Sequence, residues 1–222
     1  MTTVRSGTFS EQGTTSSVSV TKPSGAASGD RLVVFISTED SATVTCTSRP
    51  TGFTKINGGT EADPVAIDTE GADMRGFCYQ KTLDGTEGSS FTFTMSASTY
   101  VSWCAICTNG ASGSVVSTTV RTRSSIGAGT TASVSAVTLT TDQLAIAGGC
   151  GYENGGADGV TNWSEPSGST AMGFYRTSTD ATNELFTDAS GNTRWWSITV
   201  VLDAAGGGTP TTIGGYWGIR GV

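Results

Sequence analysis

The stretch SFTFTMS, residues 90–96, carries an apolar side chain at every second position: Phe91, Phe93 and Met95, with threonines between them. Successive side chains of a β-strand point to opposite faces of a sheet, so this alternation predicts a strand with one buried and one solvated face. The stretch therefore indicates a sheet that covers a core on one side only.

Similar stretches recur along the chain, separated by clusters of Gly, Pro, Asn, Asp and Ser. RLVVFIS (31–37) and SITVVLD (197–203) are apolar almost throughout and predict central strands. The other candidates are SSVSV (16–20), ATVTCT (42–47), MRGFCYQK (74–81), YVSWCAIC (100–107), SVVSTTVRT (114–122), ASVSAVTL (132–139), QLAIAGG (143–149), MGFYRT (172–177), ELFTD (184–188) and RWWSITVVL (194–202). No helix-period segment separates them, which predicts an all-β fold, a two-sheet antiparallel sandwich that is jelly-roll-like.

Composition limits the classes of partner. The 31 glycines and the scarcity of Lys and Glu disfavour helix. The 12 basic residues are outnumbered by 19 acidic ones, for a net charge of -7, and no basic run exists that would hold a nucleic acid backbone. No apolar run reaches the roughly 18 residues that span a bilayer, and the first ten residues lack the apolar segment of a signal peptide. We expect no nucleic acid or membrane partner and synthesis in a cytoplasm.

We expect residues 1–205 to form one β-sandwich domain, because all-β chains of this length are often single domains. Residues 206–222, GGGTPTTIGGYWGIRGV, begin as a Gly-rich linker and end as an aromatic and apolar peptide. Such a peptide either docks on another subunit or folds back on its own domain. Its predicted anchors are of the types that dominate interfaces: Tyr216, Trp217, Ile219 and Arg220.

Strand alternation also predicts where cysteines and tryptophans point. Cys104 and Cys107 form a C-A-I-C motif within a strand-like stretch, so their sulfurs face opposite sides and cannot share a metal. Trp195 and Trp196 are adjacent and must also face opposite sides, with one ring in the core and the other at an interface, at the second sheet or under a loop. The five cysteines, an odd number, predict reduced core thiols, with one available for an intermolecular bridge.

Two parts of the chain resemble each other in order. SGDRLVVFIS is echoed by TTDQLAIAGG, GFCYQKT by GFYRTST, and YVSWCAIC by RWWSITVV. Asp30 and Asp142 are 112 residues apart, and Tyr79 and Tyr175 are 96 apart. The echo indicates either an ancient duplication or similar demands of strands and turns.

The order of these elements carries a resemblance to a known class. SGTFS, SGDRLVVFIS, the turn RPTGFTKI, GFCYQKT, SFTFTMS and SWCAI together resemble the Gly/Ser/Thr-rich sandwich domains of virion proteins of tailed bacteriophages. The resemblance covers residues 8–202 and rests on composition and strand order rather than on a catalytic signature. It implies a non-enzymatic component of the phage head or tail.

Enzymatic chemistry has few candidates. The chain contains no histidine, which excludes Ser-His-Asp and Cys-His systems, and it has no phosphate-binding G-x-x-x-x-G-K-[ST] pattern. The acidic stretch EADPVAIDTEGAD (61–73) lacks the spacing of a calcium-binding EF-hand loop and is expected to be a solvated loop. We expect no catalytic residues, no metal and no cofactor.

The longest irregular stretch, residues 151–168, leaves three interpretations open. Its acids are solvated in a surface loop, or Tyr152, Trp163 and Glu165 form a sugar-binding surface by stacking and hydrogen bonding. The third interpretation is a glycosidase in which two facing carboxylates act. The acids available for it are Glu153, Asp158 and Glu165.

Taken together, the sequence predicts a structural virion protein, either a head decoration or accessory protein or a minor tail protein, held by its terminal segments. Its expected partners are capsid or tail subunits and copies of itself. The alternative is a carbohydrate- or receptor-binding adhesion module that contacts a host-surface glycan.

Overall fold

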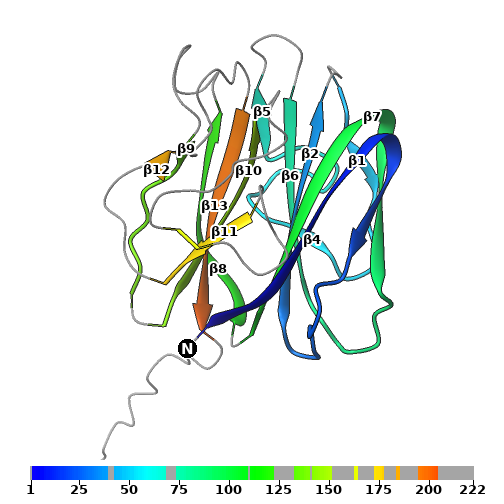
Figure 1. Cartoon of the computed structure of the whole chain (residues 1–222). Helices are drawn as coiled ribbons and strands as arrows, with labels where there is room; N and C mark the ends of the chain where they lie inside the picture. Colours follow the sequence, from blue (N-terminus) through cyan, green and yellow to red (C-terminus); the bar gives the residue numbers. More distant parts are fainter. Residues whose placement is uncertain are drawn as a thin grey trace, which may run out of the picture.

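The computed structural model of the chain is an all-β structure built from two antiparallel sheets and one short two-stranded sheet (Figure 1). It describes residues 2–39, 43–68, 74–109, 111–122, 133–140, 142–151, 163–164, 173–177, 184–185 and 195–204. No helix occurs within these ranges. The predicted all-β, two-sheet antiparallel sandwich is confirmed.

The strands follow one another along the chain as β1 (Thr3–Thr21), β2 (Arg31–Glu39), β3 (Cys46–Ser48), β4 (Thr54–Lys55), β5 (Ala66–Asp68), β6 (Met74–Thr82), β7 (Ser90–Asn109), β8 (Ala111–Thr122), β9 (Ser133–Val134), β10 (Leu144–Gly151), β11 (Gly173–Arg176), β12 (Glu184–Leu185) and β13 (Trp195–Ala204). Of the predicted strand at 132–139, residues 133–134 form the strand β9, and Val137 forms an isolated bridge. The two-residue strand β4 and the three-residue strand β5 were not predicted, since they are too short to show a period.

The first sheet has the order β1-β7-β2-β6-β4, with β3 paired to β7 and β5 to β6. Its strand β2 is central, as the apolar stretch RLVVFIS predicts. The stretches 90–96 and 100–107, which we predicted as separate strands, are joined in the single strand β7. They join because β1 runs beside both and pairs with them through three register shifts, so that the two strands bend together (Figure 1).

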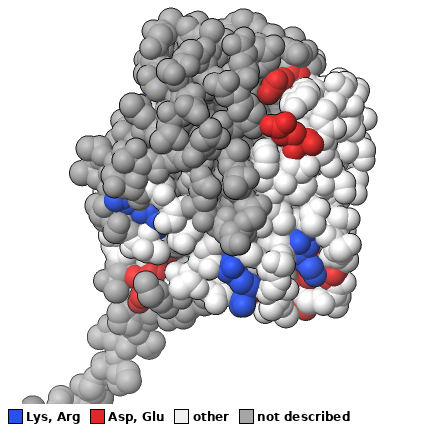
Figure 2. All heavy atoms as spheres, viewed as in Figure 1, with Lys and Arg blue, Asp and Glu red and all other residues white. Residues whose placement is uncertain are grey.

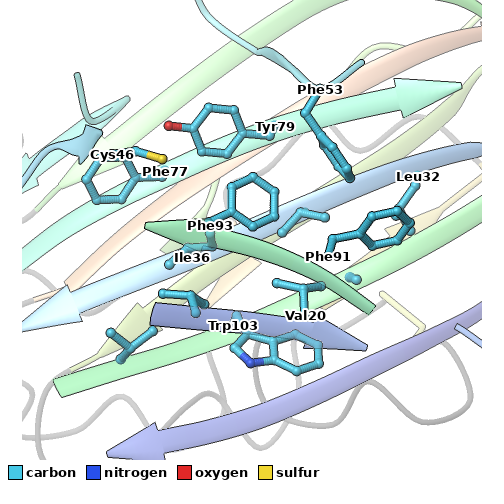
Figure 3. Packing of buried hydrophobic residues seen from close by; sticks show 14 of the residues in the cluster. Val20, Leu32, Ile36, Cys46, Phe53, Phe77, Tyr79, Phe91, Phe93 and Trp103 are labelled. Atoms are coloured by element: carbon cyan, nitrogen blue, oxygen red, sulfur yellow. The ribbon is translucent and has the colours of Figure 1, made fainter. Parts of the chain in front are cut away.

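The bend places both halves of β7 around one hydrophobic core, which we call core 1 (Figure 3). Phe91 and Phe93 come from the first half of β7, and Trp103 comes from the second half. The ring of Phe53 meets Phe91 and Phe93 edge-on, with 5.1 Å between ring centroids in both pairs. Every buried residue of core 1 lies between residues 18 and 107, so the N-terminal half of the chain has a core of its own.

The second sheet has the order β11-β10-β13-β8, and its strand β13 lies between β10 and β8 as predicted. A second core, core 2, lies between the two sheets. It combines Phe35 and Cys104 of the first sheet with Ile146, Ile198 and Val200 of the second. Core 2 joins the two halves of the chain.

The predicted splitting of closely spaced residues between faces is confirmed. Cys104 belongs to core 2, whereas Cys107, three residues later, belongs to core 1. Trp196 belongs to core 2, and its Nε1–H donates to Ser37 Oγ at 3.0 Å. Trp195 belongs to a third core on the outer face of the second sheet, so both rings are buried within the chain.

Two glycines allow the sheets to approach at core 2. A Cβ built on Gly76 would lie 2.3 Å from the Trp196 ring, and one built on Gly148 would lie 2.2 Å from the Phe35 ring. Each aromatic ring therefore lies directly on the bare backbone of the opposite sheet. No side chain larger than hydrogen fits at either position without movement of the ring.

The strand order supports the duplication hypothesis. The order β1-β7-β2-β6 of the first sheet matches the order β8-β13-β10-β11 of the second. Val34 pairs with Tyr79, and Ile146 pairs with Tyr175. Adding the offset of 112 to residue 34 gives residue 146, and adding the offset of 96 to residue 79 gives residue 175. The counterparts of two paired residues are therefore themselves paired. Similar local demands on strands do not require such agreement.

The repeated sheets stack with equivalent faces pointing the same way. Val34 and Ala105 of the first sheet face core 1, and their counterparts Ile146 and Val200 of the second sheet face core 2. We call the face that carries Val34 in the first sheet, and Ile146 in the second, the front of each sheet. The front of the second sheet therefore packs on the back of the first. This head-to-tail stacking differs from a two-fold arrangement, in which like faces meet.

Candidate functional site

The candidate site is a groove formed where β1 folds over. β1 has two arms, which we define as residues 3–12 and residues 17–21. The first arm pairs with the end of β7 and the second arm with its beginning. Gly13, with a φ of 63°, lies at the register shift between them, in the left-handed region that glycine adopts without steric penalty.

Side chains bridge the two arms. Thr8 Oγ1 donates to the carbonyl oxygen of Thr21 at 2.8 Å. The amide of Gln12 both donates to the carbonyl oxygen of Ser19 and accepts from its N–H, each at 3.1 Å. These bonds satisfy backbone groups of an edge strand that would otherwise need a partner strand or water.

The groove beside these bridges has a volume of about 430 Å³. Phe9 and Trp103 are among its lining residues, and the Phe9 ring packs against core 2 on the opposite face of β1. The rest of the lining consists of hydroxyl and amide residues: Thr8, Ser10, Gln12, Ser19 and Thr21. None of these side chains carries a charge, so the groove is polar and electrically neutral.

Trp103 forms the buried part of this lining. Its side chain is 2% exposed and belongs to core 1, and Figure 3 shows the indole between the ribbons at the edge of that core. Its Nε1–H is buried and has no hydrogen-bond partner among the described residues. A buried donor that lacks a partner costs about 1–3 kcal/mol.

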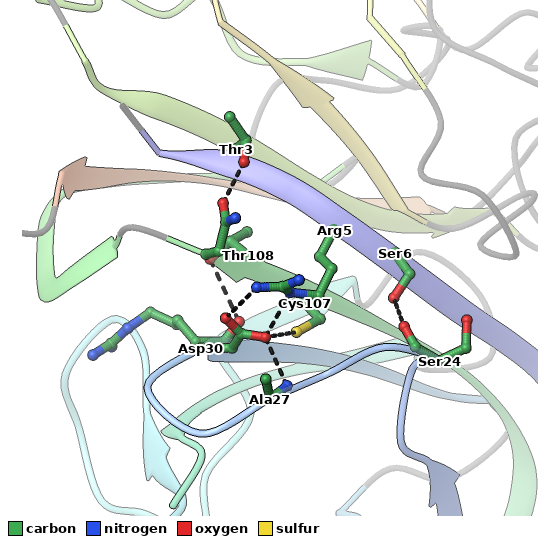
Figure 4. A network of polar contacts seen from close by, with 10 residues as sticks. Thr3, Arg5, Ser6, Ser24, Ala27, Asp30, Cys107 and Thr108 are labelled. Carbon is green, nitrogen blue, oxygen red and sulfur yellow. Dashed lines mark hydrogen bonds and ion pairs between the residues drawn. The ribbon is translucent and has the colours of Figure 1, made fainter. Parts of the chain in front are cut away.

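A second polar cluster lies at the start of β2 and is structural (Figure 4). Asp30 is buried, pairs with Arg5 at 2.7 Å and accepts from the N–H of Ala27 at 2.8 Å. The Cys107 thiol lies 3.6 Å from the same carboxylate. Burial and the Asp30 charge raise the pKa of Cys107 to about 12, so the thiol stays protonated and unreactive at neutral pH.

The other described thiols are also core groups. Cys46, Cys78, Cys104 and Cys107 are buried, which confirms the predicted core position of these four. Complete burial raises the pKa of Cys78 well above its usual range. The side chain of Cys150 lies outside the described residues.

Most of the site residues predicted from the sequence lie outside the described residues: Tyr152, Glu165, Tyr216, Trp217, Ile219 and Arg220. Trp163 is described, is 8% exposed and packs in the third core, and within the described ranges its Nε1–H has no partner. In this position its ring does not offer an open stacking surface. Trp103, which lines the groove of β1, was predicted from the sequence only as part of a strand.

The acidic stretch 61–73 is described in part. Glu61 pairs with Arg49 at 3.3 Å and accepts from the N–H of Lys55, and Asp63 accepts from the hydroxyl of Thr60. Among the described residues, no group of three or more His, Cys, Asp or Glu side chains is placed to hold a metal.

Charge is scattered on the face shown in Figure 2. Its described part carries basic and acidic side chains at separate points, without a continuous patch of one sign. No helix with the length and hydropathy needed to cross a membrane occurs in the part of the chain that the structure describes.

Comparison with known proteins gives no relative. No protein-family model, no curated protein sequence and no solved structure matches the chain. The resemblance to phage sandwich domains therefore stays a prediction, and functional proposals depend on the chain's own geometry.

Proposed function

We propose that the chain is a non-enzymatic structural component of a tailed-phage virion, a head decoration or accessory protein or a minor tail protein. It is made in the host cytoplasm and is held in the particle by its terminal segments. Its partners are capsid or tail subunits and further copies of itself. Many weak contacts to a repetitive particle surface add up to tight attachment.

The observation that carries this proposal is the position of the chain ends. The hydroxyl of Thr2 donates to the carbonyl oxygen of Asp203 at 3.3 Å, and the N-terminus lies at the tip of β13 (Figure 1). The start of β1 and the end of β13 therefore lie at the same end of the sandwich. Anchors on the two segments act at one attachment point and leave the rest of the sandwich facing outward.

The polar chemistry of the described core also supports a structural role. Asp30 fixes Arg5 and the turn at Ala27, and Cys107 is held protonated beside it. In this cluster the charged and nucleophilic groups stabilise the fold and none is activated.

Deletion of residues 209–222 tests the proposal. We expect a soluble chain with an almost unchanged melting temperature that is no longer incorporated into particles, because the deleted segment holds the docking anchors Tyr216 and Trp217. Particle incorporation is measured by co-sedimentation with purified particles. As a matched control of full length, Tyr216 and Trp217 are replaced by Ser, which should also abolish incorporation. A truncated chain that melts several degrees earlier yet still loads onto particles contradicts the docking role and favours fold-back.

A second candidate function is a carbohydrate- or receptor-binding module. The observation that favours it is the groove of β1, whose lining is rich in hydroxyl groups and carries no charge. Binding of the chain to a glycan array tests this function, because a protein that only cements particles binds no glycan.

A further inference from the structure

We propose that β8 is a docking edge at which a second copy of this chain adds its own β8 in antiparallel orientation, so that the second sheets of the two copies form one continuous sheet. This pairing deepens the proposed function, on which it rests for the contacts between copies of the chain. The test needs no particles, so its failure leaves the proposed attachment through the terminal segments untouched.

The other edges of the two sheets are blocked. Side chains bridge the edge strand β1 to its own second arm. On β11, Tyr175 exchanges both of its backbone hydrogen bonds with Ser164, at 2.8 and 2.9 Å. At the remaining edge of the first sheet, β4 and β5 have only two and three residues, and the carboxylate of Glu61 accepts from the N–H of Lys55. Short edge strands and covered backbone groups hinder pairing with another chain.

Within the described ranges, β8 is a long edge strand without such cover. It has 12 residues, and among the described strands it pairs with β13 alone. Apart from this pairing, the backbone of residues 115–121 has no hydrogen bond to any described residue. Beyond the register shift at Val116, residues 117–122 keep an unbroken register with β13. Every second residue of such an edge points its N–H and C=O away from the sheet, where another strand can pair with them.

The side chains of β8 suit a second copy of the same strand. The chain has a net charge of -7, so two copies repel each other, but β8 contains no carboxylate and its one charged residue is Arg121. An antiparallel pair that keeps equivalent faces together and centres on Thr119 places Arg121 opposite Ser117 of the second copy, so like charges do not oppose each other. Val116, a large apolar side chain that is 51% exposed, gains Thr122 of the second copy as its cross-strand neighbour.

The test measures self-association of the full chain by sedimentation velocity over a range of concentrations. We expect a concentration-dependent equilibrium between monomer and dimer. Thr119 is exposed and lies opposite its own counterpart in the proposed pair, so Thr119→Lys and Thr119→Glu should each weaken the dimer about fivefold by like-charge repulsion. An equimolar mixture of the two variants should restore dimerisation, because opposite charges then face each other.

Thr92 provides the matched control. It is exposed on β7, which is not an edge strand, so Thr92→Lys and Thr92→Glu should leave the dimer unchanged. Amide hydrogen exchange is a second, independent measurement. The outward-pointing amides of residues 117–121 should exchange more slowly in the dimer than in the monomer, because they become hydrogen-bonded.

Four results would overturn the proposal. A chain that stays monomeric at every concentration has no such docking edge. A dimer that Thr119→Lys weakens no more than Thr92→Lys does is formed by another surface, and so is a dimer in which the amides of β8 gain no protection. If the two Thr119 variants dissociate the dimer but their mixture does not restore it, β8 does not pair with itself.

Discussion

The two repeated sheets share one strand order but differ in how they cover their faces. The first sheet bends over through β1 and β7 and encloses core 1 with residues 18–107 alone. Among the described residues of its own repeat, none covers the front of the second sheet in this way. It packs on the back of the first sheet, where Phe35 and Ile106 meet Ile146 and Ile198 in core 2.

This difference indicates a hierarchy of stability. A sheet becomes stable when its apolar face is buried, and only the first sheet buries its front face with residues from its own half of the chain. The second sheet depends on the first for the burial of core 2. The same strand order thus serves as a self-contained unit in one half and as a dependent unit in the other.

The largest expected effect comes from separating the halves. Residues 2–109 expressed alone should unfold cooperatively on heating, because core 1 is complete within them. Residues 111–204 alone should show no cooperative transition, because core 2 has lost more than half of its buried residues. Near-UV circular dichroism during thermal unfolding measures both fragments.

The isolated N-terminal fragment exposes Val33, Phe35 and Ile106, so it should be compared with a variant that carries Val33→Thr and Ile106→Thr to reduce self-association. Absence of a cooperative transition in both versions would show that the halves fold only together. A cooperative transition in residues 111–204 would show that the second half folds without the first, and would contradict the proposed difference between the two sheets.

The next effect concerns the contact between the sheets. Gly148→Ala should lower the free energy of unfolding by about 3 kcal/mol, because the new methyl group overlaps the Phe35 ring. Gly88→Ala is the matched control, since a Cβ there meets no atom within 4 Å; we expect a change below about 0.5 kcal/mol. Urea titration measures both. If Gly148→Ala and Gly88→Ala changed the free energy of unfolding equally, the Phe35 ring would not lie as close to Gly148 as the structure has it.

The smallest effect compares the two aspartates that correspond in the repeats. Asp30 is buried against Arg5, whereas Asp142 is exposed with a φ of 69°. Asp30→Asn removes the charge that pairs with Arg5 and should lower the free energy of unfolding by about 2 kcal/mol. Asp142→Asn keeps a residue type that tolerates positive φ and should change it by less than about 0.5 kcal/mol. Chemical denaturation of both variants at pH 7 measures the difference, and a larger loss at Asp142 would contradict the assigned roles.

The sequence by itself determined the fold class and the direction of most core side chains. Alternation at Phe91, Phe93 and Met95 predicted their shared face, and the spacing of Cys104 and Cys107 predicted their separation between two cores, as the structure has them. These predictions succeed because a strand repeats every two residues, so local order alone assigns each side chain to a face. The echo between the two halves was likewise visible in the sequence.

Only the tertiary structure decided which faces meet and where the groove forms. The joining of residues 90–96 and 100–107 into one bent strand depends on pairing with β1, about 90 residues earlier in the chain. The groove unites Thr8, Ser19 and Trp103, whose spacing carries no local pattern. Such contacts follow from which strands pair and where the paired strands bend, because hydrogen bonds between strands and the burial of shared faces act across any sequence distance.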